Sequence, residues 1–443
     1  MTCPTNHNHS CHRKRNKVLG VPELIAIALG GMVGGGIFTI LGISVAMVGV
    51  FTPLVIVLGG IVALLAAYSY VKLGVYYQDE GATYSFFKKT FSNSHFAASL
   101  IGWWVIFGYI STLALYAYTF ASYALSSFSY ADSELLRKLV AGLVILTFTL
   151  VNIWSVKGMG EIEDIMVYTK LVLLAIISFV LINNSQTTLP VLLQHNGNTS
   201  IVSILIVASI TFVAYEGFQL VINAVSEMKN PEKNIPKAIY SAIFIAILIY
   251  VVISLGAILA IPFDSIIRNK EYALAAGTGK ILGHWGTELV ILGALLATSS
   301  AISGTVFGAS RQMAVIADDG YFPSLLAKRI NHIPVFAILT MAILAFLLVL
   351  TGGLEVILEF GSITFLLVSL LMAFANYQIR KATNSSAFIT VLSFLGLLSG
   401  TALILYYEFN NQPRQLLFIV GIYVLLTAGS WLYARGKNHE IGS

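Results

Sequence analysis

Residues 29–38, inside the first apolar segment, read LGGMVGGGIF and hold three consecutive glycines. Each glycine in the interior of a helix costs about 1 kcal/mol relative to alanine, so this run predicts a helix that is interrupted here. If the segment crosses a membrane, its freed backbone N–H and C=O groups must line a cavity or meet a polar ligand. The alternative is tight helix packing through small residues, because Gly30 and Gly34 also match a GxxxG face.

A second irregular stretch, residues 211–219, reads TFVAYEGFQ and places Glu216 and Gly217 well inside another apolar segment. An Asp at the centre of a membrane helix costs about 2.5–3.5 kcal/mol, and a Glu should cost a similar amount unless it is paired or protonated. Glu216 is therefore a candidate functional residue. The alternative is a neutral, hydrogen-bonded glutamic acid that holds two helices together.

Apolar segments fill most of the chain, which has 57% hydrophobic and only 10% charged residues. Soluble domains carry roughly 25% charged residues, so this composition excludes a water-soluble fold. Runs of about 20 apolar residues, long enough to cross a hydrocarbon core of roughly 30 Å, predict about 12 transmembrane helices. The predicted helices span residues 22–49, 52–75, 97–128, 136–155, 164–183, 199–225, 237–262, 287–317, 333–351, 356–379, 386–408 and 414–434.

The distribution of Lys and Arg residues predicts the orientation in the membrane. An even number of spans places both termini on one side, and cytoplasmic loops carry an excess of Lys and Arg. Most of these residues lie in the two tails and in the loops on the same side. The opposite loops hold only Arg137, Lys138, Arg268, Lys270, Lys280 and Arg414. We therefore expect a multi-pass cell-membrane protein with both termini cytoplasmic, whose net charge of +5 reflects topology and gives no sign of a nucleic-acid partner.

The two interrupted spans are the first and the sixth, so each begins a set of five helices. Repeats with an odd number of helices insert with opposite orientations, as in inverted-repeat transporters. The predicted fold is an all-α membrane protein with a 5+5 inverted repeat and discontinuous helices 1 and 6. The expected divisions are a cytoplasmic tail over 1–17, repeats over 18–183 and 199–382, two further helices over 384–434 and a cytoplasmic tail over 435–443.

Three motifs in the same order carry a resemblance to a known family. Residues 30–38 are similar to the first-helix pattern G-x-I-(I/M/V)-G-(S/A/G)-G-(I/V)-F, and residues 226–236, SEMKNPEKNIP, resemble E-E-x-K-N-P-x-R-x-I-P. Residues 308–311, GASR, and residues 317–323, ADDGYFP, resemble the signature after the eighth helix. Over nearly its whole length, the chain resembles the prokaryotic amino acid permeases of the amino acid-polyamine-organocation superfamily.

This resemblance implies a leucine-transporter-like fold that holds a zwitterionic amino acid between broken helices one and six. The substrate carboxylate should meet the backbone N–H groups of Gly35 and Gly36, since freed amides at a helix N-terminus favour an anion. The ammonium should meet carbonyl groups near Met32, Val213 and Glu216. The expected substrate-binding residues are Met32, Gly34, Gly35, Gly36, Tyr109, Phe212, Val213, Glu216, Phe218 and Thr305, of which Tyr109, Phe212, Phe218 and Thr305 would read the substrate side chain.

The resemblance also gives Lys170, in the fifth span, the position of a lysine that sodium-independent members use in place of a sodium ion. Its ammonium would bridge the broken first helix and Ser299 or Ser300 on the eighth helix. Desolvation disfavours the charged form of a buried lysine, so Lys170 could release its proton during a transport cycle. The alternative is that its long side chain reaches the headgroups from a position near the cytoplasmic edge.

Two departures from the family leave the proton-carrying residue open between Lys170 and Glu216. The position that is acidic in some members is Gln219 here, and Glu216 replaces a residue that is usually apolar. Val213 and Thr305 are smaller than the gating aromatic residues of some exchangers, which suggests a roomier pocket or a gate elsewhere. The expected proton-coupling residues are Lys170, Ser299, Ser300 and Glu216.

The predicted function is secondary active transport of an amino acid by alternating access, as sodium-independent, proton-coupled symport. The alternatives are an amino acid exchanger and a membrane receptor that senses an amino acid on the same fold. The expected partners are the amino acid, protons and the lipid bilayer, with no cofactor, and the substrate and the oligomeric state stay open. We expect no enzymatic activity, because the sequence contains no convincing nucleophile-base arrangement and no phosphate-binding loop.

The N-terminal tail holds a cluster of cysteine and histidine residues between residues 3 and 12. These are soft-metal ligands, but their spacing matches no zinc motif, so we expect a flexible, solvated tail, and metal binding is the alternative that the sequence leaves open.

Overall fold

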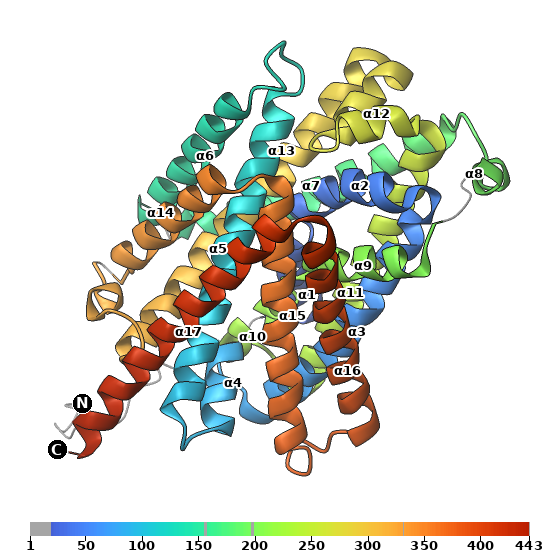
Figure 1. Cartoon of the computed structure of the whole chain (residues 1–443). Helices are drawn as coiled ribbons and strands as arrows, with labels where there is room; N and C mark the ends of the chain where they lie inside the picture. The colour runs from blue at the N-terminus through green and yellow to red at the C-terminus, as the bar shows by residue number, and fades with distance from the viewer. Residues whose placement is uncertain (1–18, 155–156, 196–198, 331, 443) are drawn as a thin grey trace.

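The structure is a computed structural model of the chain, and it describes residues 19–154, 157–195, 199–330 and 332–442. The tail with the cysteines and histidines lies outside these ranges. Most described residues belong to helices, and extended pairing within those ranges is limited to two isolated bridges. The all-α prediction is therefore correct for the described chain (Figure 1).

The helices follow the predicted apolar segments. In the first half they are α1 (Val21–Met32), α2 (Gly35–Val48), α3 (Thr52–Tyr77), α4 (Ala82–Thr90), α5 (His95–Leu125), α6 (Glu134–Trp154), α7 (Lys157–Asn183), α8 (Leu189–His195), α9 (Ile201–Thr211) and α10 (Leu220–Asn223). In the second half they are α11 (Pro231–Ala260), α12 (Phe263–Arg268), α13 (Ala273–Asp318), α14 (Val335–Thr351), α15 (Leu354–Gln378), α16 (Ala387–Asn411) and α17 (Pro413–Gly442). Short 3-10 helices lie between them, η1 (Gly49–Phe51), η2 (Phe212–Tyr215), η3 (Val225–Glu227) and η4 (Ser324–Ala327).

Ten helical segments of the described chain are long and apolar enough to cross a membrane, and α1 and α14 are shorter apolar helices. Residues 35–77 form one of the ten, because α3 follows α2 directly across the short η1 turn. The structure thus confirms a helical protein with many possible membrane spans. The number of 12 spans stays a prediction.

The outer surface carries apolar side chains that would be unfavourable in water. On α6 they form a stripe spaced three or four residues apart, and each is more than half exposed. The members of this stripe are Leu135, Leu139, Leu143, Leu146 and Leu150. Such spacing places all five on one face of the helix. An exposed apolar face of this kind fits the hydrocarbon core of a bilayer.

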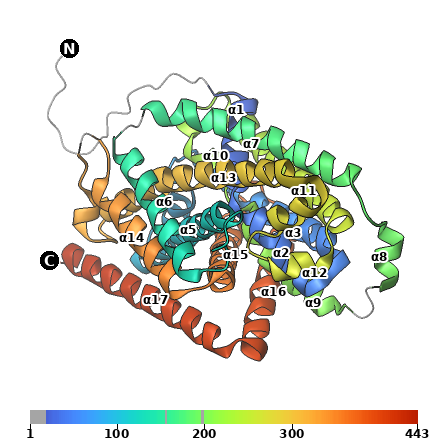
Figure 2. The ribbon, with the colours of Figure 1, turned by 90° about the horizontal axis from the view of Figure 1, so that it is seen from above.

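The interrupted helices lie inside the bundle. α1 packs against α7, α10, α11 and α13, and α2 packs against α5, α9, α12 and α13. Seen from above, α7 and α17 lie on opposite sides of the molecule (Figure 2). Neighbouring helices therefore surround the helix breaks and shield their backbone groups from lipid.

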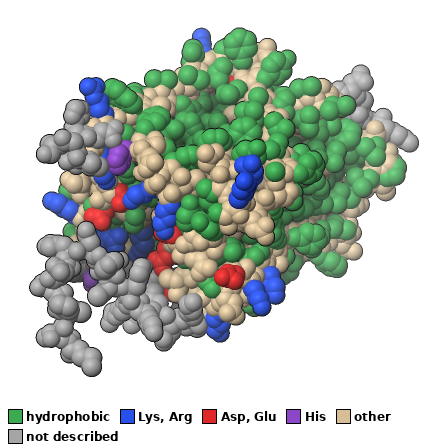
Figure 3. Space-filling model, turned by 90° about the horizontal axis from the view of Figure 1, so that it is seen from below, with side chains coloured by type: hydrophobic (Ala, Val, Ile, Leu, Met, Phe, Trp, Pro, Cys, Tyr) green, Lys and Arg blue, Asp and Glu red, His purple; other side chains and the backbone are tan. Residues whose placement is uncertain are grey.

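The two ends of the bundle are different in character. α12 lies at one end, and α4 lies at the other, where α17 also finishes (Figure 1). Seen from below, the end with α4 shows Lys, Arg, Asp and Glu side chains gathered over part of its face (Figure 3). Lys88 and Lys89 of α4 form ion pairs there with Asp319 and Asp79. This end carries loops that the sequence assigns to the cytoplasmic side.

Candidate functional site

The first interruption follows the glycine-rich run. α1 ends at Met32, the next two residues leave the helical conformation, and α2 begins at Gly35. No side chain caps the N-terminus of α2, because the residue at the capping position is Gly34. The first N–H groups of a helix have no partner within it and carry the positive end of the helix dipole. The buried interior therefore contains a helix N-terminus that suits an anion.

The second interruption lies at the acidic residue of the sixth span. α9 ends at Thr211, the 3-10 turn η2 follows, and Glu216 is extended with φ −67° and ψ 137°. Gly217 has φ +125°, a conformation that residues with a side chain rarely adopt. The α-helix resumes at Leu220. Both stretches that were expected to be irregular are thus interrupted in the structure.

The two interruptions touch each other. A Cβ atom added to Gly217 would lie only 2.5 Å from the carbonyl carbon of Gly31, so no side chain fits there without backbone movement. Small-residue packing also occurs, because a Cβ atom added to Gly34 would lie 2.7 Å from the Cβ atom of Ala301 on α13. The glycines therefore permit both the helix interruption and the close packing, which the sequence had posed as alternatives.

Two tyrosine hydroxyl groups meet the freed carbonyl groups. Tyr250 on α11 donates to the carbonyl oxygen of Met32 at 2.7 Å and lies 3.1 Å from that of Ala214, so it bridges both interruptions. Tyr116 on α5 donates to the carbonyl oxygen of Gly31 at 3.3 Å. Neither tyrosine was predicted from the sequence to belong to the site. A hydroxyl group within an apolar span is a signal that could have found them, since buried tyrosines usually need a partner.

We expect Tyr250→Phe to lower the stability of the protein by about 1–3 kcal/mol, because it removes the hydroxyl group that donates to buried carbonyl oxygens of both interruptions. Phenylalanine keeps the ring that packs against Tyr215, whose centroid is 5.4 Å away, so the loss reports the hydroxyl group alone. The melting temperature of the purified protein measures it. Tyr406→Phe on the outer surface of α16 is the matched control and should melt like the wild type. Equal melting of both variants would contradict the bridging role.

Glu216, Gln219 and Tyr109 form a hydrogen-bonded group beside the second interruption. The side-chain amide of Gln219 donates to Glu216 Oε2 at 2.9 Å and to the Tyr109 hydroxyl at 3.3 Å. Its oxygen accepts the backbone N–H of Gly217 at 3.0 Å. The other Glu216 oxygen, Oε1, is buried and has no hydrogen-bond partner among the described residues. A buried oxygen without a partner is costly, so this atom can accept a proton or a donor group from a ligand.

Lys170 lies on α7 with its side chain fully buried. Its ammonium donates to the carbonyl oxygen of Gly30 at 3.0 Å and to Ser300 Oγ at 2.8 Å. The structure thus joins α1 to α13 through this side chain, with Ser300 rather than the half-buried Ser299 as the hydrogen-bonding serine. The alternative that Lys170 extends to the headgroups is wrong, because the buried ammonium contacts protein groups of the interior.

The residues expected to read the substrate side chain are only partly brought together. Tyr109 joins the hydrogen-bonded group, whereas Phe218 packs its ring edge-on against Tyr70 of α3 at a centroid distance of 5.3 Å. Phe212 and Thr305 are both buried, on η2 and α13 respectively. That these residues contact the side chain of a substrate stays a prediction.

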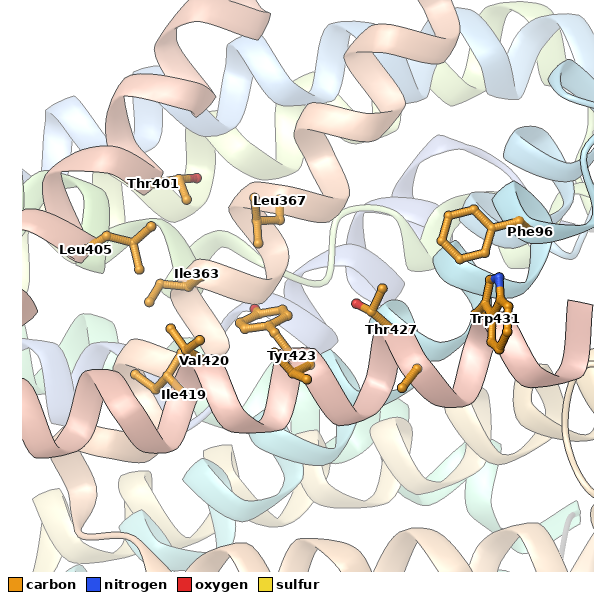
Figure 4. A pocket seen from close by; sticks show the side chains of 12 residues that line it. Phe96, Ile363, Leu367, Thr401, Leu405, Ile419, Val420, Tyr423, Thr427 and Trp431 are labelled. Carbon is orange, nitrogen blue, oxygen red and sulfur yellow. The ribbon is translucent and has the colours of Figure 1, made fainter.

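The interior around the interruptions is closed in this structure. The Met32 and Val213 side chains are 1% and 2% exposed, and Glu216 is 3% exposed. Two surface grooves lie elsewhere, one between α15, α16 and α17 (Figure 4) and one between α5, α14 and α17. Both are lined almost wholly by apolar side chains such as Leu367 and Phe418, which suits lipid tails better than a zwitterion. A ligand of the interior must therefore enter through helix movement.

Comparisons with known proteins agree with this architecture. A family model described as amino acid permease matches residues 19–430 of the chain. The chain is 27% identical over 424 residues to the inner membrane transport protein YbaT of Escherichia coli, a match that covers 96% of this chain and 98% of that protein. The two proteins therefore share nearly their full length.

Two further relatives carry substrate classes in their names. The chain is 26% identical over 416 residues to the cationic amino acid transporter 7, chloroplastic, of Arabidopsis thaliana, covering 86% of this chain and 69% of that protein. It is 25% identical over 340 residues to the branched-chain amino acid permease BcaP of Bacillus subtilis, covering 72% and 71% respectively. The two names indicate different substrates at similar sequence distance.

Proposed function

Because the chain belongs to the amino acid permease family, we propose that it is a secondary active transporter that carries an amino acid across the cell membrane by alternating access. The expected mode is proton-coupled and sodium-independent symport. One observation carries the proposal, namely the contact of two interrupted helices in a buried interior. Interrupted backbone at membrane depth is tolerated where it is buried in protein or lines a cavity, and transporters use such segments to bind polar substrates.

The substrate carboxylate is proposed to bind the first turn of α2. The backbone N–H groups of Gly35 and Gly36 begin this helix, and no side chain caps it. A Cβ atom added to Gly36 would lie 3.0 Å from Cα of Ala214, so backbone from the second interruption lies beside this turn. A carboxylate placed there would face the positive end of a helix dipole in a site without bulk water.

The substrate ammonium is proposed to bind on the side of Glu216. The carbonyl oxygen of Met32 already accepts both the Tyr250 hydroxyl group and the backbone N–H of Gly34. The carbonyl oxygen of Ala214 accepts the Tyr250 hydroxyl group, and a carbonyl oxygen can accept a second donor. Glu216 Oε1 lacks a partner among the described residues and can take the ammonium directly or through water. The backbone groups and Glu216 would bind the carboxylate and the ammonium, which all amino acids share. Side-chain selectivity then depends on residues such as Tyr109.

Lys170 is proposed to carry or sense the coupled proton. Its two hydrogen bonds connect α1 with α13, so loss of its proton would weaken the contact of the first interrupted helix with its neighbour. A charged ammonium in the interior is costly unless it is paired, which makes its protonation sensitive to movement of these helices. Glu216 is the second candidate, because it also lies buried beside the interruptions.

We propose a leucine-transporter-like 5+5 inverted repeat, with repeats over residues 18–183 and 199–382 and helices α16 and α17 outside them. The cytoplasmic face would be the end with α4 and with the end of α17, and both termini would lie there. The Lys and Arg distribution along the loops supports this orientation.

The test of the proposed function is a screen of all amino acids for binding to the purified protein by thermal shift, followed by uptake in proteoliposomes. Uptake is measured with and without an inward proton gradient and an inward sodium gradient. We expect accumulation that follows the proton gradient and ignores sodium. Binding without uptake would instead favour the receptor, and uptake that requires an amino acid inside the vesicle would favour the exchanger.

We expect Glu216→Gln to change the substrate range or the pH response of uptake while the protein still folds. The amide keeps an oxygen that can accept from Gln219, but it carries no negative charge for an ammonium. Uptake of the panel at two pH values, together with the melting temperature, measures this. Glu232→Gln at the exposed start of α11 is the control. A variant that only loses stability would show that Glu216 serves packing.

A further inference from the structure

An apolar groove runs along the outer surface between α15, α16 and α17, away from the helix interruptions (Figure 4). Its volume is about 570 Å³. It is lined by Ile363 and Leu367 of α15, Leu405 of α16, and Val420 and Val424 of α17. On the outer surface of a membrane-embedded helical bundle, a groove of this kind lies against lipid tails. The transport proposal does not use it.

Aromatic side chains mark one end of this groove. Phe96, at the start of α5, and Trp431, near the end of α17, lie together there, and Thr401 and Leu405 of α16 lie at the other end (Figure 4). Phe96 is 39% exposed and Trp431 is 49% exposed. Tryptophan is enriched where the hydrocarbon core meets the headgroups, because its ring is apolar and its N–H group is polar. The aromatic end, which we call the groove mouth, therefore fits the level of the lipid headgroups.

A cation continues the groove-lining face of α17 beyond the groove mouth. Val424, Ala428 and Trp431 line the groove at a spacing of three or four residues. Arg435 follows four residues after Trp431, so it lies on the same face of the helix. Its guanidinium carbon lies 5.4 Å from the centre of the Trp431 ring. The Arg435 side chain is exposed, so its charge is accessible at the groove mouth.

A second cation of α17, Lys437, lies two residues further along the helix. Its ammonium donates to the backbone carbonyl oxygen of Asp319 after α13 and lies 4.7 Å from the centre of the Tyr321 ring. The Asp319 carboxylate instead forms an ion pair with Lys88 of α4 at 2.7 Å. Within the described part of the chain, no carboxylate ion pair offsets the charges of Arg435 and Lys437. This end of α17 therefore presents positive charge beside the groove mouth.

We propose that the groove and its mouth form a binding site for an anionic phospholipid. An acyl chain would lie in the groove, and the phosphate would meet Arg435, whose guanidinium can donate two parallel hydrogen bonds to phosphate oxygens. An anionic headgroup is favoured over a choline or an ethanolamine headgroup, because these add a cation beside Arg435 and Lys437. The inference goes beyond the proposed function and does not depend on transport.

The opposite end of α17 offers a matched cation that does not follow the groove. Arg414, at the start of the helix, is exposed like Arg435. Val420 is the groove-lining residue six positions later, and six residues of an α-helix place two side chains about 120° apart. Arg414 therefore points away from the groove-lining face. It has the same charge, helix and exposure as Arg435, but not its place at the groove.

The site is tested on the full-length protein, purified in detergent and depleted of lipid. Dioleoyl phosphatidylglycerol or dioleoyl phosphatidylcholine is added back, and native mass spectrometry counts the lipids that each protein molecule retains. The wild type should bind phosphatidylglycerol more tightly than phosphatidylcholine, and added salt should reduce this preference. Arg435→Gln should weaken phosphatidylglycerol binding roughly tenfold, because it removes a charged hydrogen-bond donor. Arg414→Gln should bind both lipids like the wild type.

Ala428→Phe tests the groove itself while Arg435 stays in place. Ala428 lines the groove and is exposed, so the added ring fills the groove without entering the core. This variant should retain less phosphatidylglycerol, and the lipid should raise its melting temperature less than that of the wild type.

Three outcomes would overturn the proposed lipid site. The first is equal binding of the two lipids by the wild type. The second is wild-type binding of phosphatidylglycerol by both Arg435→Gln and Ala428→Phe. The third is a dimer that forms without lipid and is lost in Ala428→Phe, because a second copy of the chain would then occupy the groove.

Discussion

Lys170→Ala is expected to abolish pH-dependent amino acid uptake in proteoliposomes. The substitution removes the two hydrogen bonds that join Gly30 on α1 to Ser300 on α13, and it leaves both of these buried groups without that partner. Each hydrogen bond to a charged group contributes about 1.5–3 kcal/mol, and every 1.4 kcal/mol corresponds to about a tenfold change in an equilibrium. We therefore expect uptake to fall at least about tenfold and its response to an imposed proton gradient to vanish.

Three further variants separate proton coupling from packing at Lys170. Lys170→Met fills a similar volume without the ammonium and should lose uptake like alanine. Lys170→Arg keeps a permanent charge, so it should bind substrate yet fail to couple uptake to the proton gradient. Lys233→Ala, at an exposed position of α11, should behave like the wild type. Wild-type pH-dependent uptake by Lys170→Ala would remove this residue from the mechanism.

Gly217→Ala is expected to abolish uptake by forcing the two interruptions apart. Gly217 has φ +125°, and a residue with a side chain is held in such a conformation at a cost of about 1–3 kcal/mol. Its new methyl group would also lie 2.5 Å from the carbonyl carbon of Gly31, a backbone atom that cannot rotate away. Uptake in proteoliposomes measures the loss of transport. The melting temperature and amino acid binding by thermal shift measure the loss of stability and of binding.

Gly421→Ala provides the matched glycine control for that prediction. Gly421 lies within α17, and an added Cβ atom would meet no atom within 4 Å. Alanine favours the helix by about 1 kcal/mol relative to glycine, so this variant should retain uptake and melt slightly higher. If Gly217→Ala bound and transported substrate as well as Gly421→Ala does, the contact of the interruptions would not be part of the site.

The helix interruptions could be predicted because their causes are local. Consecutive glycines weaken the helix in residues 29–38, and an acidic residue followed by glycine marks residues 211–219. The structure ends α1 at Met32 and places φ +125° at Gly217, within these stretches. Apolar runs likewise gave the positions of the long helices, because the thickness of a bilayer sets their length.

The contacts around the interruptions could not be predicted from the same signals. Tyr250 bridges Met32 and Ala214 from α11, which requires the relative rotation and depth of helices that are distant in sequence. The contact of Lys170 with the first helix was expected because the family resemblance implied it. Which of the two serines Lys170 contacts, Ser299 or Ser300, depends on the rotation of α13 about its axis. Periodicity shows which face of a helix is apolar but does not show which neighbour covers it.

The short helices could not be predicted for a related reason. α4 and α12 lie between the long spans and are too short to give a membrane-length apolar run.

The two interruptions are proposed to bind both the carboxylate and the ammonium group of an amino acid. Competition binding measures this most directly, once the screen has identified a ligand, by comparing the free amino acid with its methyl ester and its N-acetyl derivative. Each derivative removes one charged end and leaves the side chain intact, so each should bind at least about tenfold more weakly. Equal binding of the amino acid and both derivatives would contradict recognition by the freed backbone and Glu216.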